Sequence, residues 1–225
     1  MDESRVDSVR GRQIVRLPGL ALRRQAAAYQ HIVVDLGAGD GRWIYRLARA
    51  HPAWFCLAVD ANAGGMREAS FRAGRKPSRG GAANACFVRA AAEALPPALD
   101  GFADAVHVHL PWGSLLRAVV TPDVEVLRRI ARLGKPGAAF RVRVNASIVH
   151  DRDLAARLGV PSLGNEDVGT HLAEGYAAAG IRLETWEWAL DPIRTSWGRR
   201  LTHQGPVPLL ALDGIIGRQV FAREA

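Results

Sequence analysis

The segment from His31 to Gly41 constrains the fold more than any other part of the chain. It reads His-Ile-Val-Val-Asp-Leu-Gly-Ala-Gly-Asp-Gly, an apolar strand that runs into a glycine-dense turn. Glycine permits tight turning and close approach of the backbone to a ligand. The helix that follows would present unpaired amide groups at its first turn. The segment therefore predicts a nucleotide-binding turn between a strand and a helix.

Strand-like and helix-like runs alternate along most of the chain. The predicted strands before residue 145 cover 31–36, 54–59, 85–88, 105–110 and 138–144, and the predicted helices cover 42–50, 66–75 and 124–132. Such alternation is typical of an α/β, Rossmann-like fold with a mostly parallel sheet. Two closing strands, 181–190 and 219–223, are expected to be antiparallel neighbours and bring the sheet to seven strands.

The length of 225 residues suits one domain, so we expect residues 1–225 to form a single unit. Residues 1–30 are an N-terminal extension with a hairpin over 6–17. Two connections, 145–180 and 191–218, exceed the usual loop of ~4 to 6 residues. The first carries helical patterns at 151–158 and 166–179, whereas the second is rich in Gly and Pro without periodicity. We interpret both as elaborated segments for substrate recognition.

The chain shows neither a signal pattern nor an apolar run approaching ~20 residues, which predicts a soluble cytoplasmic protein. Cys56 and Cys86 lie inside apolar strands and are expected to be small buried hydrophobes. The seven histidines show no ligand spacing with cysteine or carboxylate, so no metal site is expected.

Positive charge is segregated along the chain. Lys and Arg number 30 against 22 Asp and Glu, for a net charge of +8. Three windows, 8–34, 69–92 and 192–212, contain arginines but no acidic residue. A GC-rich genome would also enrich arginine, but the segregation favours a polyanionic partner.

Carboxylates near the glycine turn indicate which nucleotide is bound. Asp35 stands two residues before the first glycine, and position 42, where an NAD fingerprint needs glycine, is Arg. This form is associated with S-adenosylmethionine, whose amino-acid moiety a carboxylate can meet. Asp60 closes the second strand, where it can accept hydrogen bonds from ribose hydroxyls. The predicted cofactor-binding residues here are Asp35, Gly37, Ala38, Gly39, Asp60, Ala92 and Glu93.

The end of the fourth predicted strand points to the target. It reads His107-Val-His109-Leu-Pro-Trp112-Gly-Ser, without the Asn or Asp that enzymes acting on exocyclic amines place there. Trp112 offers an aromatic plate, and Trp197, inside the basic long loop, offers a second. Extruding a base costs a few kcal/mol, and stacking returns ~1 to 3 kcal/mol per aromatic contact, so two tryptophans can grip one base. A role of His107 or His109 as base is conceivable, but packing is favoured.

With these residues in view, the chain resembles the aminoglycoside-resistance 16S rRNA methyltransferases that modify N1 of adenine 1408, the kanamycin-apramycin resistance family. The matching motifs are Val34–Gly41, Ala91–Pro96, Leu110–Leu115 and Thr195–Arg200. The resemblance implies a class I methyltransferase fold, S-adenosyl-L-methionine as methyl donor and 16S rRNA in the 30S subunit as partner.

The resemblance also assigns individual residues. It implies that Trp112 and Trp197 bracket a flipped adenine. It places five further residues near the cofactor: Leu110, Pro111, Ser114, Thr195 and Ser196. It implies rRNA contacts for the basic residues Arg72, Arg75, Lys76, Arg79, Arg194, Arg199 and Arg200. We expect a monomer without metal or membrane association.

Three alternatives stay open at this point. An enzyme acting on guanine N7 of rRNA or tRNA would share the cofactor turn and the positive charge. A small-molecule methyltransferase would need no acid-free basic windows. A noncatalytic RNA-binding module would explain the charge and the tryptophans, but it leaves Asp35, Asp60 and Glu93 without a role.

Overall fold

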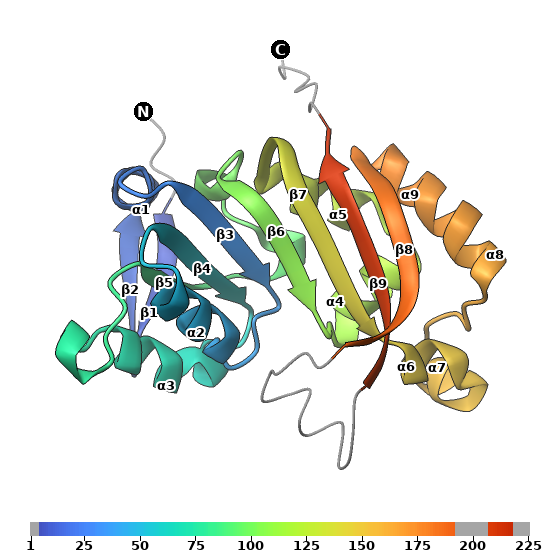
Figure 1. Cartoon of the computed structure of the whole chain (residues 1–225), viewed down its shortest axis with the longest axis horizontal. Coiled ribbons are helices and arrows are strands. Elements are labelled where there is room, and N and C mark those ends of the chain that lie inside the picture. Colours follow the sequence, from blue (N-terminus) through green and yellow to red (C-terminus); the bar gives the residue numbers. More distant parts are fainter. Residues whose placement is uncertain (1–4, 192–206, 218–225) are drawn as a thin grey trace.

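The computed structural model describes residues 5–191 and 207–217. Its strands form one sheet in the order β2-β1-β5-β4-β3-β6-β7-β9-β8 (Figure 1). The strands are β1 (Arg5–Arg10), β2 (Gln13–Pro18), β3 (His31–Leu36), β4 (Trp54–Asp60), β5 (Ala85–Arg89), β6 (Ala103–His109), β7 (Gly134–Asn145), β8 (Ile181–Asp191) and β9 (Val207–Ile216). The α-helices are α1 (Gly19–Ala26), α2 (Arg42–Ala50), α3 (Ala63–Ala73), α4 (Gly113–Val120), α5 (Val124–Arg132), α6 (Ala146–His150), α7 (Arg152–Leu158), α8 (Asn165–Asp167) and α9 (Ala173–Ala178).

The centre of the sheet is parallel, as the alternation of strands and helices predicted. Strands β5, β4, β3, β6 and β7 pair in parallel, and β9 then pairs antiparallel with both β7 and β8. The N-terminal hairpin joins the same sheet because β1 pairs antiparallel with β5, with Asp7 opposite Arg89. The predicted Rossmann-like α/β class with a seven-stranded core is confirmed, and the hairpin extends that core by two strands.

The prediction that segment 191–218 is a loop throughout was wrong. Strand β9 occupies Val207–Ile216, inside the stretch expected to be a loop, whereas the predicted strand 219–223 lies outside the described residues. Proline and glycine, here Pro208 and Gly214, are uncommon inside strands, so the sequence pattern did not indicate a strand here. Pro208 is its second residue, near a strand start where proline is tolerated. A side chain at Gly214 would meet the carbonyl oxygen of Arg182 at 2.4 Å, so glycine permits the close pairing with β8.

Two apolar layers cover the sheet. On one face Ile44 and Ala48 of α2 and Met66 of α3 pack against Val33 and Cys56. A larger core on the other face holds residues of α1, α4, α5 and α9. In Figure 1 α2 and α3 lie in front of the first strands, whereas α5 lies behind the sheet. Both cysteines are buried, as expected.

Segment 145–180 is largely helical. It contains α6 to α9 and a π-helical turn over Val168–Leu172, in agreement with the two predicted helical patterns. It is fixed to the main core by Tyr176, which is fully buried and donates a hydrogen bond to the carbonyl of Val119 at 3.0 Å. No helix in the described ranges is long and apolar enough to cross a membrane.

Candidate active site

The turn between β3 and α2 depends on glycine. Gly37 and Gly39 have φ angles of +73° and +59°, which residues with side chains rarely adopt. The N–H groups of Gly37 and Ala38 donate to the carbonyl of Val59 at 2.8 and 3.1 Å. These bonds tie the turn to the end of β4. The first turn of α3 also approaches closely, because a side chain at Gly65 would meet the carbonyl oxygen of Gly39 at 2.6 Å.

Asp60 ends β4 and fastens the same turn. One of its carboxylate oxygens accepts a hydrogen bond from the N–H of Gly39 at 2.8 Å, and the other accepts one from Asn62 at 2.7 Å. A carboxylate offers about four acceptor positions, so it can also receive ligand hydroxyls. Asp60 therefore holds the glycine turn in place, a role that the sequence did not indicate.

Asp35 lies at the carboxyl end of β3 with its side chain only 3% exposed. Nδ1 of His109, at the end of β6, lies 3.1 Å from Oδ1 of Asp35. The edge of the Trp43 ring, on α2, packs against the His109 ring with centroids 4.4 Å apart. Burial raises the pKa of Asp35, and the hydrogen bond with His109 opposes that rise. The result is a desolvated carboxylate held by one neighbouring imidazole.

His107 lies two residues earlier on β6 and is buried. Its Nδ1 has no hydrogen-bond partner in the part of the chain that the structure describes. Burial, followed by the charge of His109, lowers the pKa of His107 to about 2. A group with so low a pKa is a poor proton acceptor at neutral pH, which fits the packing role favoured from the sequence.

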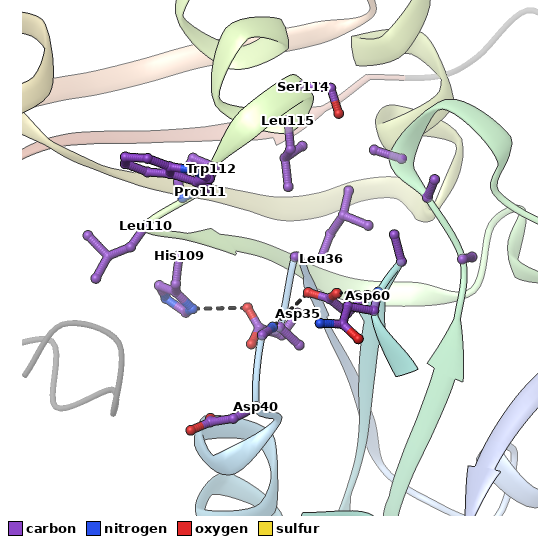
Figure 2. A pocket seen from close by; sticks show the side chains of 18 of the residues that line it. Asp35, Leu36, Asp40, Asp60, His109, Leu110, Pro111, Trp112, Ser114 and Leu115 are labelled. Carbon is purple, nitrogen blue, oxygen red and sulfur yellow. Dashed lines mark hydrogen bonds and ion pairs between the residues drawn. The ribbon is translucent and has the colours of Figure 1, made fainter. Parts of the chain in front are cut away.

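The glycine turn, Asp35, Asp60 and His109 border a cavity of about 440 Å³ at the carboxyl edge of the parallel strands, and Figure 2 shows side chains that line it. This volume falls in the range of small-molecule sites. The cavity brings together eleven residues predicted from the sequence: Asp35, Gly37, Ala38, Gly39, Asp60, Ala92, Glu93, Leu110, Pro111, Trp112 and Ser114. It is also lined by Trp43 and Asn62, which the sequence did not assign to it, and by His109, for which the sequence favoured a packing role.

The rim of the cavity is a rigid loop between β6 and α4. Leu110 has a φ of +48°, the one positive φ of a residue other than glycine in the described ranges. Its N–H donates to the carbonyl of Arg143 at 2.7 Å, and its side chain packs on Leu209. Pro111 follows, and Trp112 then lies 48% exposed above the cavity (Figure 2). The loop thus presents a flat aromatic ring beside the cavity.

The predicted basic residues Arg72, Arg75, Lys76 and Arg79 are exposed at the end of α3 and in the 3₁₀ turn Pro77–Arg79. The remaining predicted residues lie outside the described ranges: Arg194, Thr195, Ser196, Trp197, Arg199 and Arg200. Within residues 5–191 and 207–217, no group of three or more His, Cys, Asp or Glu side chains is placed to hold a metal ion.

The fold is that of a Rossmann-like class I methyltransferase. Its sheet is parallel with antiparallel closing strands, a glycine turn follows β3, and carboxylates lie at the ends of β3 and β4. The family model of NpmA, described as 16S rRNA (adenine(1408)-N(1))-methyltransferase, matches residues 7–210. The chain belongs to this family.

Individual relatives agree with this assignment. The 16S rRNA (adenine(1408)-N(1))-methyltransferase of Streptoalloteichus tenebrarius is 36% identical over 92% of this chain and 97% of its own length. The enzyme of the same name from Escherichia coli is 32% identical over 78% of this chain and 81% of its own length. A crystal structure of a variant of that enzyme from Catenulisporales acidiphilia, with cosubstrate SAM, has a TM-score of 0.87 and 34% identity. It covers 96% of this chain and 98% of that one.

Proposed function

We propose that this protein transfers the methyl group of S-adenosylmethionine to N1 of adenine 1408 in the 16S rRNA of the 30S subunit and thereby confers aminoglycoside resistance. One observation carries the proposal. The predicted cofactor residues that lie within the described ranges and the exposed Trp112 converge on one cavity, in a chain that belongs to this family. The relative solved with cosubstrate SAM supports the choice of methyl donor.

The cavity suits this donor. Asp35 is a buried carboxylate that fits the ammonium group of the amino-acid moiety, and Asp60 has acceptor positions left for ribose hydroxyls. Ala92 and Glu93 follow β5 and also line the cavity, where they contact the adenine ring of the cofactor. When bound, S-adenosylmethionine supplies an electrophilic methyl group on a sulfonium. The residues of the chain bind and orient it.

Trp112 serves as one face of the target site. Its exposed ring stacks on the flipped adenine, and Trp197 takes the other face. Unpaired adenine carries an in-plane lone pair on N1, so the transfer needs no general base. Catalysis rests on holding that lone pair in line with the methyl group. The methylated base is cationic, and the indole faces stabilise it.

The rest of the chain recognises the ribosomal subunit. The exposed cations of α3 and the 3₁₀ turn, together with the arginines of segment 191–218, contact RNA phosphates, which fix the position of the enzyme on a shape-defined surface. Segments 145–180 and 191–218 serve substrate recognition. We propose that the protein acts as a monomer, in the cytoplasm where its substrate is found.

The test is methylation of purified 30S subunits with a radiolabelled methyl donor, followed by primer extension. We expect a stop at adenine 1408, because N1-methyladenine blocks reverse transcription. A modified guanine that stops the polymerase only after chemical cleavage would instead indicate an N7 enzyme. Absence of any label on the subunits would overturn the proposal.

A variant pair tests the role of Trp112. Trp112→Ala should leave the affinity for S-adenosylmethionine unchanged and reduce methylation by about a hundredfold, because one stacking contact worth ~1 to 3 kcal/mol is lost. Trp112→Phe should retain much of the activity. Trp186→Ala, which truncates a comparably exposed tryptophan on β8, is the matched control. Equal activity of Trp112→Ala and the control would remove Trp112 from the site.

A further inference from the structure

A second recess lies outside the site described above, between the N-terminal hairpin and α3. The hairpin lies next to α3 at the lower left of Figure 1. The recess has a volume of about 460 Å³. Its lining includes Arg10, Arg75 and the amide of Gln25, and it includes no carboxylate in the described part of the chain. The electrostatics of this recess therefore favour an anion.

Arg75 is held in place by an aromatic ring. Its guanidinium lies over the ring of Phe71, 5.1 Å from the ring centroid. Phe71 is 58% exposed, which is unusual for so large an apolar side chain. A guanidinium that lies over an aromatic ring keeps N–H donors available, and these match a phosphate group bidentately. The stacking also reduces the side-chain freedom that binding would otherwise cost.

The backbone next to Arg10, at the tip of the hairpin, is fixed to α3. The N–H of Gly11 donates to Oγ of Ser70 on α3 at 2.9 Å. A side chain at Gly11 would meet Cδ2 of Phe71 at 3.5 Å, so the turn packs directly against that ring. Arg10 and Arg75 therefore lie on two elements that are fastened to each other at this point.

The acidic residues on these elements are engaged elsewhere. Glu68 on α3 pairs with Arg42 and Arg72, at 2.6 and 2.5 Å. Asp7 on β1 pairs with Arg16 and Arg89. Within the described ranges no carboxylate forms an ion pair with Arg10 or Arg75. The same is true of Lys76 and Arg79, which continue the positive surface beyond α3.

We infer that this recess binds a backbone phosphate of the RNA substrate. Arg10 and Arg75 donate to it, and Phe71 acts as a positioning residue for Arg75. The inference rests on the proposed function for the identity of the RNA. The recess borders Ala85 and Cys86, at the amino end of β5, whereas the cofactor cavity lies at the carboxyl ends of the strands. A phosphate bound there would fix the orientation of the enzyme from the far end of α3.

The experiment measures the affinity of the full chain for 30S subunits as a function of salt, with purified Arg10→Glu and Arg10→Gln variants. We expect about tenfold weaker binding for Arg10→Glu. For Arg10→Gln the log-log salt slope should become shallower by about 0.7 to 0.9, the value for one lost phosphate contact. The control is Arg129→Glu, the same charge reversal on an exposed residue of α5, behind the sheet. Affinity for S-adenosylmethionine should not change in any of these variants.

Phe71→Leu tests the positioning role, since it keeps apolar contact with the hairpin but removes the aromatic face. It should weaken subunit binding three- to fivefold, and Phe71→Tyr should restore it. If Arg10→Glu and Arg129→Glu weaken subunit binding equally, the effect is general charge repulsion and the inference is overturned. An unchanged salt slope for Arg10→Gln would also overturn it. If the wild-type protein binds subunits without producing a stop at 1408, the proposed function is overturned. The subunit affinities of the Arg10 and Arg129 variants would still test the phosphate site.

Discussion

The imidazole Nδ1 of His109 lies 3.1 Å from the carboxylate of Asp35, and the two side chains come from neighbouring parallel strands. Within the described residues this is the one side-chain hydrogen bond that Asp35 receives, and the carboxylate is almost fully buried. A buried charge requires such a partner to offset its loss of water. His109 therefore acts as a positioning residue for Asp35.

Removal of this partner should weaken cofactor binding. His109→Ala is expected to lower the affinity for S-adenosylmethionine about tenfold, since a hydrogen bond to a charged group contributes about 1.5 to 3 kcal/mol. His109→Asn, whose amide nitrogen can take the place of Nδ1, should restore most of it. Isothermal titration calorimetry measures both values. Equal affinity of the Ala variant and wild type would contradict the positioning role.

The pH dependence of that affinity separates positioning from simple loss of packing. His109 lowers the pKa of Asp35, whereas burial and the charges of Asp60 and Asp40 raise it. Without His109 the pKa of Asp35 should rise further, so its carboxylate becomes protonated at a higher pH. Affinity in His109→Ala should therefore begin to fall at a higher pH than in wild type as the solution is acidified.

Asp35→Asn should stabilise the fold while it weakens cofactor binding. Burial raises the pKa of Asp35 in the folded state. The ionised carboxylate consequently costs folding free energy above that pKa, and it costs nothing below the unfolded value of about 4. The gain in melting temperature should be present at about pH 8 and vanish at about pH 3. An equal gain at both values would contradict this account, and calorimetry should show at least tenfold weaker binding of S-adenosylmethionine.

Gly65→Ala should separate α3 from the glycine turn. The added methyl group would lie 2.6 Å from the carbonyl oxygen of Gly39, and the backbone must shift to accommodate it. We expect a loss of about 1 to 3 kcal/mol in unfolding free energy and weaker cofactor binding. Gly74→Ala, at the other end of α3, has no atom closer than 3.6 Å and is the matched control. Similar denaturation midpoints for the two variants would argue against the close approach.

His107→Leu should stabilise the protein, most of all in mild acid. The substitution removes a buried Nδ1 without a partner in the described ranges. The pKa of His107 is about 2 in the folded state and about 6.5 when unfolded, so wild type loses stability as the pH falls below the unfolded value. At about pH 5 this loss amounts to about 2 kcal/mol. Urea denaturation of both proteins at about pH 5 and pH 8 measures the difference, and an identical difference at both values would refute it.

Local patterns were sufficient to predict most of the architecture. The glycine turn after 31–36 and the alternation of strands and helices depend on short stretches of chain, and the structure has them where they were expected. The helix α4 over Gly113–Val120 was not anticipated. Strand β9 was not anticipated because Pro208 lies near its start, and because its close contact with β8 requires Gly214.

Sequence motifs identified residues that line the cavity, but not the contacts between them. Asp35 was identified from its place two residues before the first glycine and Asp60 from its place at the end of a strand, and both border the cavity. The contact of His109 with Asp35 depends on the register of β3 against β6, in which Asp35 stands opposite His107. No local pattern carries that register. The role of Asp60 in holding Gly39 likewise appears only once the ends of two strands are placed side by side.

The left-handed backbone at Leu110 has a consequence for how this protein can change. The direction of the rim is set by that residue, by its bond to the Arg143 carbonyl and by its contact with Leu209, and the ring at position 112 contributes to none of these. The backbone of the rim keeps its direction when a different side chain stands at position 112. The side chain at position 112 can therefore change without disturbing the contacts that set the direction of the rim.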